Sequence, residues 1–432
     1  MKLKINPSVT VGTIKPMNAV NNGPKYTDNA DQNLTNLPAF KAANIPYARV
    51  HDASICYDYG GEHTVDIHNI FPDFSADPYS PEAYDFTLTD MYLDHIELAG
   101  AEPFYRLGSK IEHWPKHYGI LPPADPHKWA VVCEHIIMHM NEGWADGRYR
   151  GIKYWEIWNE PDFNEKCWLG TPEDFYELFA VTAKHLKSRF PELKIGGPAV
   201  CGFNEKWLRP FFEKMRSENV PMDFYSWHRY GSYVADFTDD ARRHRALLDE
   251  FGYTEAESIL DEWNYVRGWS GEEWKNSLQT ELSMKGAAMI SAVMAACQRE
   301  AVDMLMYYDA RINSTMNGLF SFGTLEPLKG CHALSAWGEL LAAGDECKTE
   351  CDVPDIYAAA AVKDGKTVTV VTYYTDDEAA LPRSFTVELP GDELRTVSLL
   401  DESRDMTPYL SIAPDGGRFT LTMQPNTVVV IK

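Results

Sequence analysis

The chain has 432 residues and a formal net charge of −24, from 64 acidic and 40 basic side chains. Its 44% hydrophobic and 24% charged residues are typical of a globular protein with a large core, which excludes a disordered or fibrous chain. The acidic balance disfavours nucleic acid and membrane surfaces as partners, because both require a face rich in lysine and arginine.

From residue 9 to residue 345, short apolar runs alternate with longer amphipathic segments. The apolar runs predict eight strands, at Thr10–Ile14, Tyr47–His51, Pro103–Leu107, Lys153–Trp158, Lys194–Gly197, Asp223–His228, Ser258–Glu262 and Asp303–Tyr308. The segments between them have helical spacing, at 30–44, 82–98, 126–143, 171–188, 204–218, 239–252, 272–299 and 332–343. Eight strands that alternate with eight helices predict an α/β fold, a (β/α)₈ TIM barrel over residues 9–345.

Two other segments have a different character. Residues 52–81, rich in Asp, Tyr, Pro and Gly, are too long for an ordinary loop, and we expect them to build over the barrel mouth. Residues 350–432 contain six short runs rich in Val, Thr and Tyr, separated by turn sequences, which predict a C-terminal accessory β-sandwich. Leu3–Ile5, within residues 1–8, offers this sandwich a further strand.

The remaining sequence features concern location and cofactors. The first residues match no secretory signal, and the eight cysteines are scattered without a C-x-x-C pair, so we expect a cytoplasmic protein with reduced thiols. His135 and His139 have metal-ligand spacing, but the glutamate of the helical zinc motif is absent, which favours an ordinary helix face. No nucleotide-binding motif occurs. We therefore expect no cofactor and no metal.

In a barrel, catalytic groups project from the carboxyl ends of the strands. The fourth predicted strand continues through Trp158-Asn159-Glu160-Pro161-Asp162. Alternation places Glu160 at the rim, with Glu156 one layer lower on the same side. The seventh strand ends in Asp261-Glu262-Trp263-Asn264. Two glutamates therefore reach the same barrel mouth.

These motifs resemble the clan A glycoside hydrolases, which are retaining enzymes. In that clan the general acid/base is the glutamate of an Asn-Glu-Pro motif on strand four, which implies Glu160. The nucleophile is a glutamate that ends strand seven, which implies Glu262. With Asn21-Asn22-Gly23-Pro24 and the run from Ser226 to Tyr230, the whole barrel is similar to glycoside hydrolase family 39. That family contains β-xylosidases and α-L-iduronidases, and it carries an accessory sandwich.

The chemistry can also be argued from the residues. Cleavage with retention requires two carboxyl groups about 5–5.5 Å apart, one as nucleophile and one as acid and then base. Strands four and seven lie across the barrel, so Glu160 and Glu262 can converge on a sugar between them. We expect Glu160 to be protonated and Glu262 to be kept ionised by Tyr230 and Arg49.

Further mouth residues are predicted to bind substrate, each with an alternative role. Asn159 is assigned to the sugar 2-hydroxyl or to a turn cap, and His228 to substrate, to Glu160 or to a structural role. Arg49 is expected to pair with Glu156 or Glu262. Other residues expected to line the subsites are His51, Asp52, Lys110, Glu112, His113, Trp114, Trp263, Tyr308 and Asp309.

The sequence thus predicts a retaining O-glycosidase that acts on a glycoside or oligosaccharide, with an exo-acting β-xylosidase as the first interpretation. An α-L-arabinosidase comes next. An iduronidase is less favoured because a uronate requires a cationic clamp, for which Lys110 and Arg106 are the candidates near the mouth. A non-catalytic carbohydrate-binding barrel and a metal-dependent hydrolase are the competing classes. Homo-oligomerisation, exo or endo action and ligand binding by the sandwich stay open.

Overall fold

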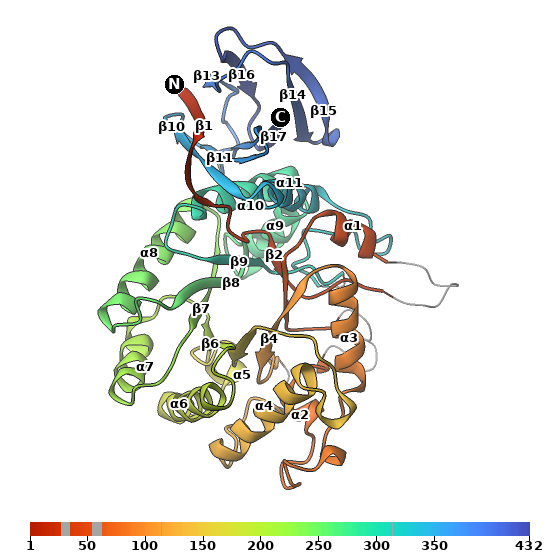
Figure 1. The fold of residues 1–432 in the computed structure, drawn as a ribbon, viewed down its shortest axis with the longest axis vertical. Helices are drawn as coiled ribbons and strands as arrows, with labels where there is room; N and C mark the ends of the chain where they lie inside the picture. The colour runs from red at the N-terminus through yellow and green to blue at the C-terminus, as the bar shows by residue number, and fades with distance from the viewer. Residues whose placement is uncertain (27–34, 54–62, 114, 313) are drawn as a thin grey trace.

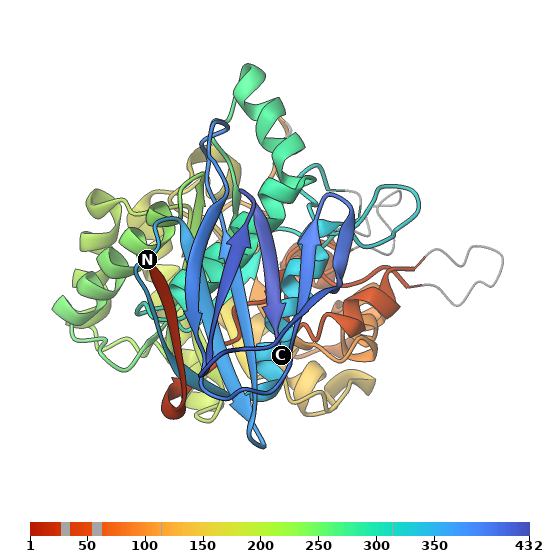
Figure 2. The ribbon, with the colours of Figure 1, turned by 90° about the horizontal axis from the view of Figure 1, so that it is seen from above.

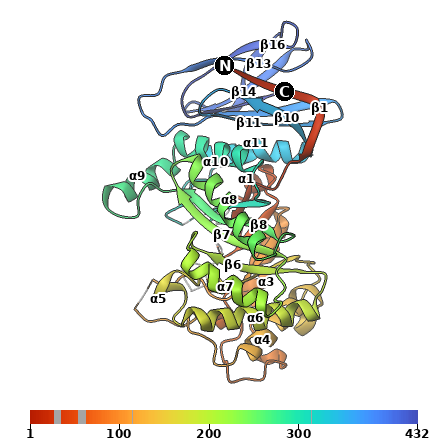
Figure 3. The same ribbon diagram turned by 90° about the vertical axis from the view of Figure 1, so that its left-hand side faces the viewer.

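The computed structural model describes residues 1–26, 35–53, 63–113, 115–312 and 314–432. Within these ranges, eight parallel strands close into a barrel in chain order, β2 to β9, and nine strands form a second sheet. The second sheet stacks on one side of the barrel, over helices α10 and α11 (Figures 1 and 3). The predicted fold class is confirmed.

The barrel strands are short and almost completely buried. They are β2 (Ala19–Asn21), β3 (Tyr47–Val50), β4 (Glu102–Leu107), β5 (Tyr154–Ile157), β6 (Lys194–Val200), β7 (Phe224–Gly231), β8 (Glu257–Tyr265) and β9 (Met304–Tyr307). Such strands are apolar on both faces because side chains fill the barrel inside and helices cover it outside.

The helices around the barrel follow the predicted segments. The longer ones are α3 (Thr87–Leu98), α4 (Pro126–Asn141), α6 (Pro172–Arg189), α7 (Glu205–Ser217), α8 (Val234–Glu250), α9 (Gly271–Glu281), α10 (Met284–Cys297) and α11 (Lys329–Ala343). Shorter helical turns are α1 (Leu37–Ala42), α2 (Ile67–Ile70), η4 (Pro81–Ala83), η5 (Trp144–Asp146) and α5 (Asn164–Cys167).

Local sequence explains where several helices begin. At α6, the Thr171 hydroxyl accepts from the backbone N–H of Asp174, and the Asp174 carboxylate accepts from the backbone N–H of Thr171. This reciprocal capping satisfies N–H groups that have no partner within the helix. The single helix predicted over 272–299 is two helices, since Ser283 caps a new start by accepting from Lys285 and Gly286.

The first barrel strand was predicted wrongly. The expected strand Thr10–Ile14 falls largely in β1 (Lys2–Thr13), which pairs antiparallel with β10 (Asp345–Cys351) in the second sheet. The barrel begins instead with β2, whose three residues are too few to show a periodic pattern. The first third of the predicted helix at 30–44 lies outside the described ranges, and α1 covers 37–42 of the remainder.

The second sheet has the order β15-β14-β17-β12-β11-β10-β1-β13-β16. Its remaining strands are β11 (Ile356–Lys363), β12 (Lys366–Tyr373), β13 (Arg383–Glu388), β14 (Arg395–Asp401), β15 (Arg404–Ile412), β16 (Arg418–Met423) and β17 (Thr427–Ile431). The six strands predicted in the tail are present, Leu3–Ile5 pairs as expected within β1, and β10 and β15 are additional strands.

This sheet, seen from above in Figure 2, buries side chains on both of its faces. In β11, Ala358 and Ala360 face the core of the sheet domain, while Ala359 and Ala361 join the core of the barrel. Alternate side chains of a strand point to opposite faces, so one strand serves two cores. The hydroxyls of Ser291 on α10 and Thr372 on β12 also bond across the interface at 2.6 Å.

In the part of the chain that the structure describes, no helix combines the length and the apolar character needed to span a bilayer.

Candidate active site

The turn after β5 presents Glu160 at the carboxyl end of the barrel. Trp158 and Glu160 both have positive φ angles, 78° and 48°, which cost about 1–3 kcal/mol per residue unless the surroundings hold them. Here the backbone N–H of Trp158 donates to Leu107 O at 2.7 Å, and that of Glu160 donates to Ala199 O at 2.8 Å. The neighbouring strands therefore fix the backbone that aims Glu160 into the mouth.

A β-bulge presents two consecutive acidic residues from β8. The pairing registers shift between Leu260 and Trp263 against β9, and between Trp227 and His228 on β7. As a result Asp261 and Glu262 both contact the buried Arg49, although strict alternation would point one of them outward. Trp263 then faces outward.

The carboxylates of Glu160 and Glu262 meet beside His228. One oxygen of each carboxylate and one ring nitrogen of His228 lie within 4.8 Å of one another. His228 Nδ1 is 2.9 Å from Glu160 Oε1 and 3.8 Å from Glu262 Oε2, and its Nε2 is 3.6 Å from Asp261 Oδ1. This spacing is compatible with the roughly 5–5.5 Å between the carboxyl groups of retaining glycosidases.

Arg49 on β3 organises the acids below the mouth. Its side chain is completely buried, and the neighbouring carboxylates raise its pKa although burial acts in the opposite direction. Five oxygen atoms surround its guanidinium: Glu156 Oε2 at 2.7 Å, Asn159 Oδ1 at 2.8 Å, Asp261 Oδ2 at 3.0 Å, Asn21 Oδ1 at 3.0 Å and Glu262 Oε2 at 3.3 Å.

Burial makes the protonation states of these groups unequal. Burial and the nearby Asp261 raise the pKa of Glu156 to about 8, so Glu156 is neutral at pH 7. The pKa of Asp261 is lowered, because Arg49 and His228 outweigh the effect of burial. Burial also favours neutral His228, but Glu262, Asp261 and Glu160 raise its pKa well above the ordinary value, so the ring is an imidazolium.

The two predicted partners of Glu262 are in place. Tyr230 Oη donates to Glu262 Oε1 at 2.5 Å, and Arg49 Nη1 lies 3.3 Å from Oε2. Burial nevertheless raises the pKa of Glu262, with a further contribution from the charge of Glu160, while His228, Arg49 and Tyr230 act in the opposite direction. The donors expected to keep Glu262 ionised are therefore present, but removal from water outweighs their effect on its pKa.

Several other predicted residues lie at the ends of β3 and β9, the two strands that flank β2. Asp52 Oδ1 is 2.8 Å from Lys110 Nζ, and Asp52 Oδ2 is 3.4 Å from Arg311 Nη1, so the pKa of Asp52 is held low despite burial. The rings of His51 and Tyr308 meet edge to face. Burial raises the pKa of the neighbouring Asp309 to about 7.

Other predicted substrate residues have different positions. Trp263 is fully buried in the barrel core against Phe237 and Tyr307, because the bulge turns it outward. Glu112 accepts from the backbone N–H groups of Tyr118 and Gly119, at 2.8 and 2.9 Å, and so organises a loop. His113 is exposed. Trp114 lies outside the described residues.

Arg106 was also misjudged as a candidate clamp. It is completely buried, and its Nη2 contacts Asp66 Oδ1 at 2.6 Å and His51 O at 3.1 Å. Asp261 was missed as a site residue, because only one of two consecutive residues was expected to point inward, and the bulge that brings Glu262 to the same side depends on pairing with β7 and β9. His135 and His139 bond to the carbonyls of Val131 and Trp144 through Nδ1, as expected of an ordinary helix face.

Among the described residues, two groups place three metal-binding side chains close together. One is Glu160, His228 and Glu262, and the other is His63, Asp66 and His68.

Comparison with known proteins identifies the family. The sequence model described as "Glycosyl hydrolases family 39" matches residues 38–275, more than half of the chain and a span that holds Glu160 and Glu262. The chain belongs to glycosyl hydrolase family 39.

Among curated proteins, this family 39 chain is similar to two beta-xylosidases. That of Geobacillus stearothermophilus is 28% identical over 173 residues, 38% of this chain and 34% of the relative. That of Caldicellulosiruptor saccharolyticus is 27% identical over 161 residues, 35% of this chain and 32% of the relative. The chain thus matches about a third of the length of these relatives.

Solved structures share the fold over the entire chain. A glucosidase from Croceicoccus marinus has a TM-score of 0.80 at 22% identity, with 100% of this chain and 98% of that one covered. A monomeric beta-xylosidase from Caulobacter crescentus has a TM-score of 0.75 at 16% identity, with 100% and 98% covered. A GH51 alpha-L-arabinofuranosidase from Thermotoga petrophila reaches 0.72 at 16% identity, with 100% and 99% covered. Both domains of the family 39 chain therefore have counterparts.

Proposed function

We propose that this protein is a retaining glycoside hydrolase, with Glu160 as acid/base and Glu262 as nucleophile, and that its substrate is a β-xyloside. The observation that carries this proposal is the approach of the two carboxylates to within 4.8 Å, beside His228, at the ends of β5 and β8. Family membership and the similarity to beta-xylosidases support the assignment.

In the first step, the Glu262 carboxylate attacks the anomeric carbon and forms a C–O bond. The glycosidic C–O bond breaks, and Glu160 gives its proton to the leaving oxygen. In the second step, a water molecule gives a proton to Glu160 and attacks the same carbon. The bond to Glu262 then breaks, the sugar leaves with retained configuration, and both glutamates return to their starting states.

The surrounding residues prepare each glutamate for its role. Arg49 and Tyr230 donate to opposite oxygens of Glu262, which stabilises the carboxylate against burial. His228 bonds to Glu160 and thereby sets the direction of its carboxyl group. Arg49 Nη2 also donates a hydrogen bond to Asn159 Oδ1. The amide NH₂ of Asn159 therefore points away from Arg49, the orientation needed to donate to a sugar hydroxyl.

The charges at the mouth favour a neutral sugar over a uronate. Lys110 is paired with Asp52 and Arg106 with Asp66, so both candidate clamps already hold a carboxylate. A β-xylosidase is therefore preferred to an iduronidase, and an arabinosidase is the second choice. Exo action and cytoplasmic location stay predictions, and homo-oligomerisation stays open.

A panel of nitrophenyl glycosides tests the substrate, with the β-xyloside expected to be cleaved fastest. Azide tests the roles of the glutamates. Glu262→Ala should lose turnover and, with azide, give the glycosyl azide of inverted configuration, because azide occupies the place of the nucleophile. Glu160→Ala with azide should give the retained product. The opposite stereochemistry in the two variants would reverse the assignment, and turnover retained in both would reject it.

A further inference from the structure

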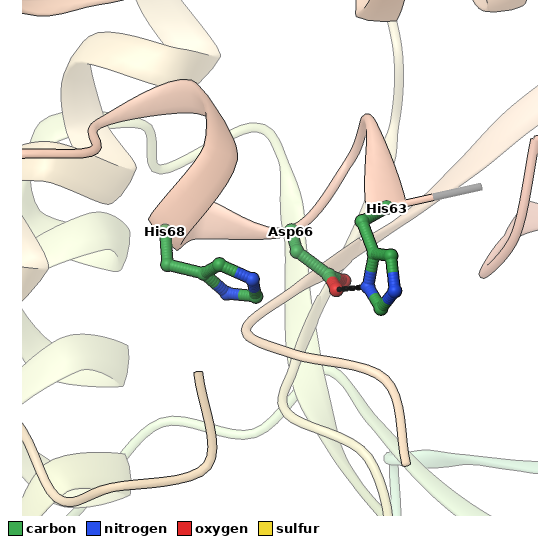
Figure 4. Close-up of side chains that lie close together, drawn as sticks. All are labelled: His63, Asp66 and His68. Atoms are coloured by element: carbon green, nitrogen blue, oxygen red, sulfur yellow. Dashed lines mark hydrogen bonds and ion pairs between the residues drawn. The ribbon is translucent and has the colours of Figure 1, made fainter. Parts of the chain in front are cut away.

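Two histidines and an aspartate form a cluster between β3 and α3, apart from the catalytic glutamates. His63, Asp66 and His68 each contribute one nitrogen or oxygen, and these three atoms lie within 4.8 Å of one another. Figure 4 shows the two imidazoles on either side of the Asp66 carboxylate, with His63 Nδ1 at 3.0 Å from Asp66 Oδ2. The three side chains come from one short segment, and His68 lies in α2.

Two donors hold one oxygen of the Asp66 carboxylate in place. Its Oδ1 accepts from Arg106 Nη2 at 2.6 Å and from the backbone N–H of Lys110 at 3.1 Å. Arg106 is on β4 and completely buried, so this support belongs to the rigid barrel wall. Outer partners that fix a carboxylate in this way are a regular feature of metal sites. The other carboxylate oxygen, Oδ2, faces the histidines, 3.0 Å from His63 Nδ1.

The His68 ring has a nitrogen without a protein partner. Its Nδ1 is buried, and no described residue forms a hydrogen bond with it. A Cβ at residue 119 would lie only 2.2 Å from this atom, so the glycine there leaves room for the ring. A cavity of about 650 Å³ adjoins the cluster and is lined by His63, His68 and Glu112 among others. It gives access to an ion and space for water as a further ligand.

We propose that His63, Asp66 and His68 bind a divalent metal ion of the zinc class. Two imidazoles and one carboxylate with an open position are a donor set that Zn²⁺ uses, whereas Ca²⁺ and Mg²⁺ prefer oxygen ligands throughout. Ligand bonds of about 2.0–2.2 Å in tetrahedral geometry hold ligand atoms about 3.3 Å apart. The His63 and Asp66 atoms, at 3.0 Å, already have this spacing, so only the His68 ring needs to approach, by up to about 1.5 Å, a movement within reach of side-chain rotation. The bound ion ties the segment at 63–68 to β4 through the Asp66–Arg106 pair.

The experiment uses the full chain, freed of metal by a chelator, dialysed and titrated with Zn²⁺ against a chromophoric chelator. Because Glu160, His228 and Glu262 also lie close enough to bind an ion, the titration is carried out in the Glu160→Gln/Glu262→Gln double variant. We expect one equivalent of Zn²⁺ to bind. His63→Ala and His68→Ala should each weaken that binding by at least ~10-fold, the smallest effect usual for loss of even an outer partner. His127→Ala removes an exposed histidine and should change nothing.

Two further measurements distinguish an ion bound at this cluster from one bound elsewhere on the protein. Zn²⁺ should raise the Tm of the double variant but not that of its His63→Ala derivative, in which the lost side chain is only partly buried and the fold is kept. Co²⁺ in place of Zn²⁺ should give visible absorption bands without thiolate charge transfer, since the cysteines take no part. Equal Zn²⁺ affinity in His63→Ala and His127→Ala, or no bound equivalent at all, would overturn the proposal. Neither readout depends on glycosidase activity.

Discussion

The hydrogen bond from Tyr230 to Glu262 offers a quantitative test of the proposed nucleophile. Tyr230→Phe removes a donor 2.5 Å from Glu262 Oε1 and keeps the ring that packs against Trp269. A hydrogen bond to a charged group contributes about 1.5–3 kcal/mol. Because this bond favours the ionised form, its loss raises the pKa of Glu262 further, by about one to two pH units at 1.36 kcal/mol each.

The assay is kcat/KM for a nitrophenyl xyloside as a function of pH. The acidic limb of the variant's profile should move to higher pH by that amount, so that kcat/KM on this limb falls by about 10–150-fold. At high pH, where Glu262 is ionised in both proteins, the two profiles should converge. Tyr149→Phe, which alters a surface tyrosine that is 81% exposed, is the matched control. An unmoved acidic limb, or one displaced to lower pH, would refute the reasoning.

Three further outcomes are expected. Glu156→Gln should keep kcat/KM within about 3-fold at pH 7, because burial raises the pKa of Glu156 to about 8 and the native side chain is already neutral there; a large loss at pH 7 would show that it is ionised. Trp269→Ala removes a ring that is 60% exposed beside Tyr230, and it should raise KM for aryl glycosides by about 2–12-fold with kcat unchanged, from a ring contact of about 0.5–1.5 kcal/mol. An equal fall in kcat would contradict a binding role. Asp66→Asn should lower the free energy of unfolding by about 2–3 kcal/mol in urea titrations, because Arg106 is left buried without a counter-charge. Burial alone would raise the pKa of Asp66, but Arg106 outweighs it and lowers that pKa from 3.8 to about 2. The difference in unfolding free energy between the variant and the native chain should therefore persist above pH 4 and fade as the pH drops through 2.

Periodicity and short motifs were enough to predict the barrel and its two central acids. Seven of the eight barrel strands have a predicted counterpart, because buried parallel strands are continuous apolar runs that stand out between amphipathic helices. Glu160 and Glu262 follow such runs directly, and the carboxyl ends of all barrel strands share one face. Local sequence therefore carries both the fold class and the candidates for catalysis.

Contacts between distant residues decided the rest. Arg49 was expected to pair with Glu156 or Glu262, but the sequence does not indicate that its one guanidinium contacts both of them and Asp261 as well, across up to 213 positions of the chain. The bulge in β8 turns Glu262 to the same inner side as Asp261 and turns Trp263 outward, a departure from alternation that depends on pairing with β7 and β9. Likewise β1 leaves the barrel because β10, more than 300 residues later, supplies its hydrogen-bond partners. Sequence patterns report the local preference of a segment, and only the packed chain decides which distant partner satisfies it.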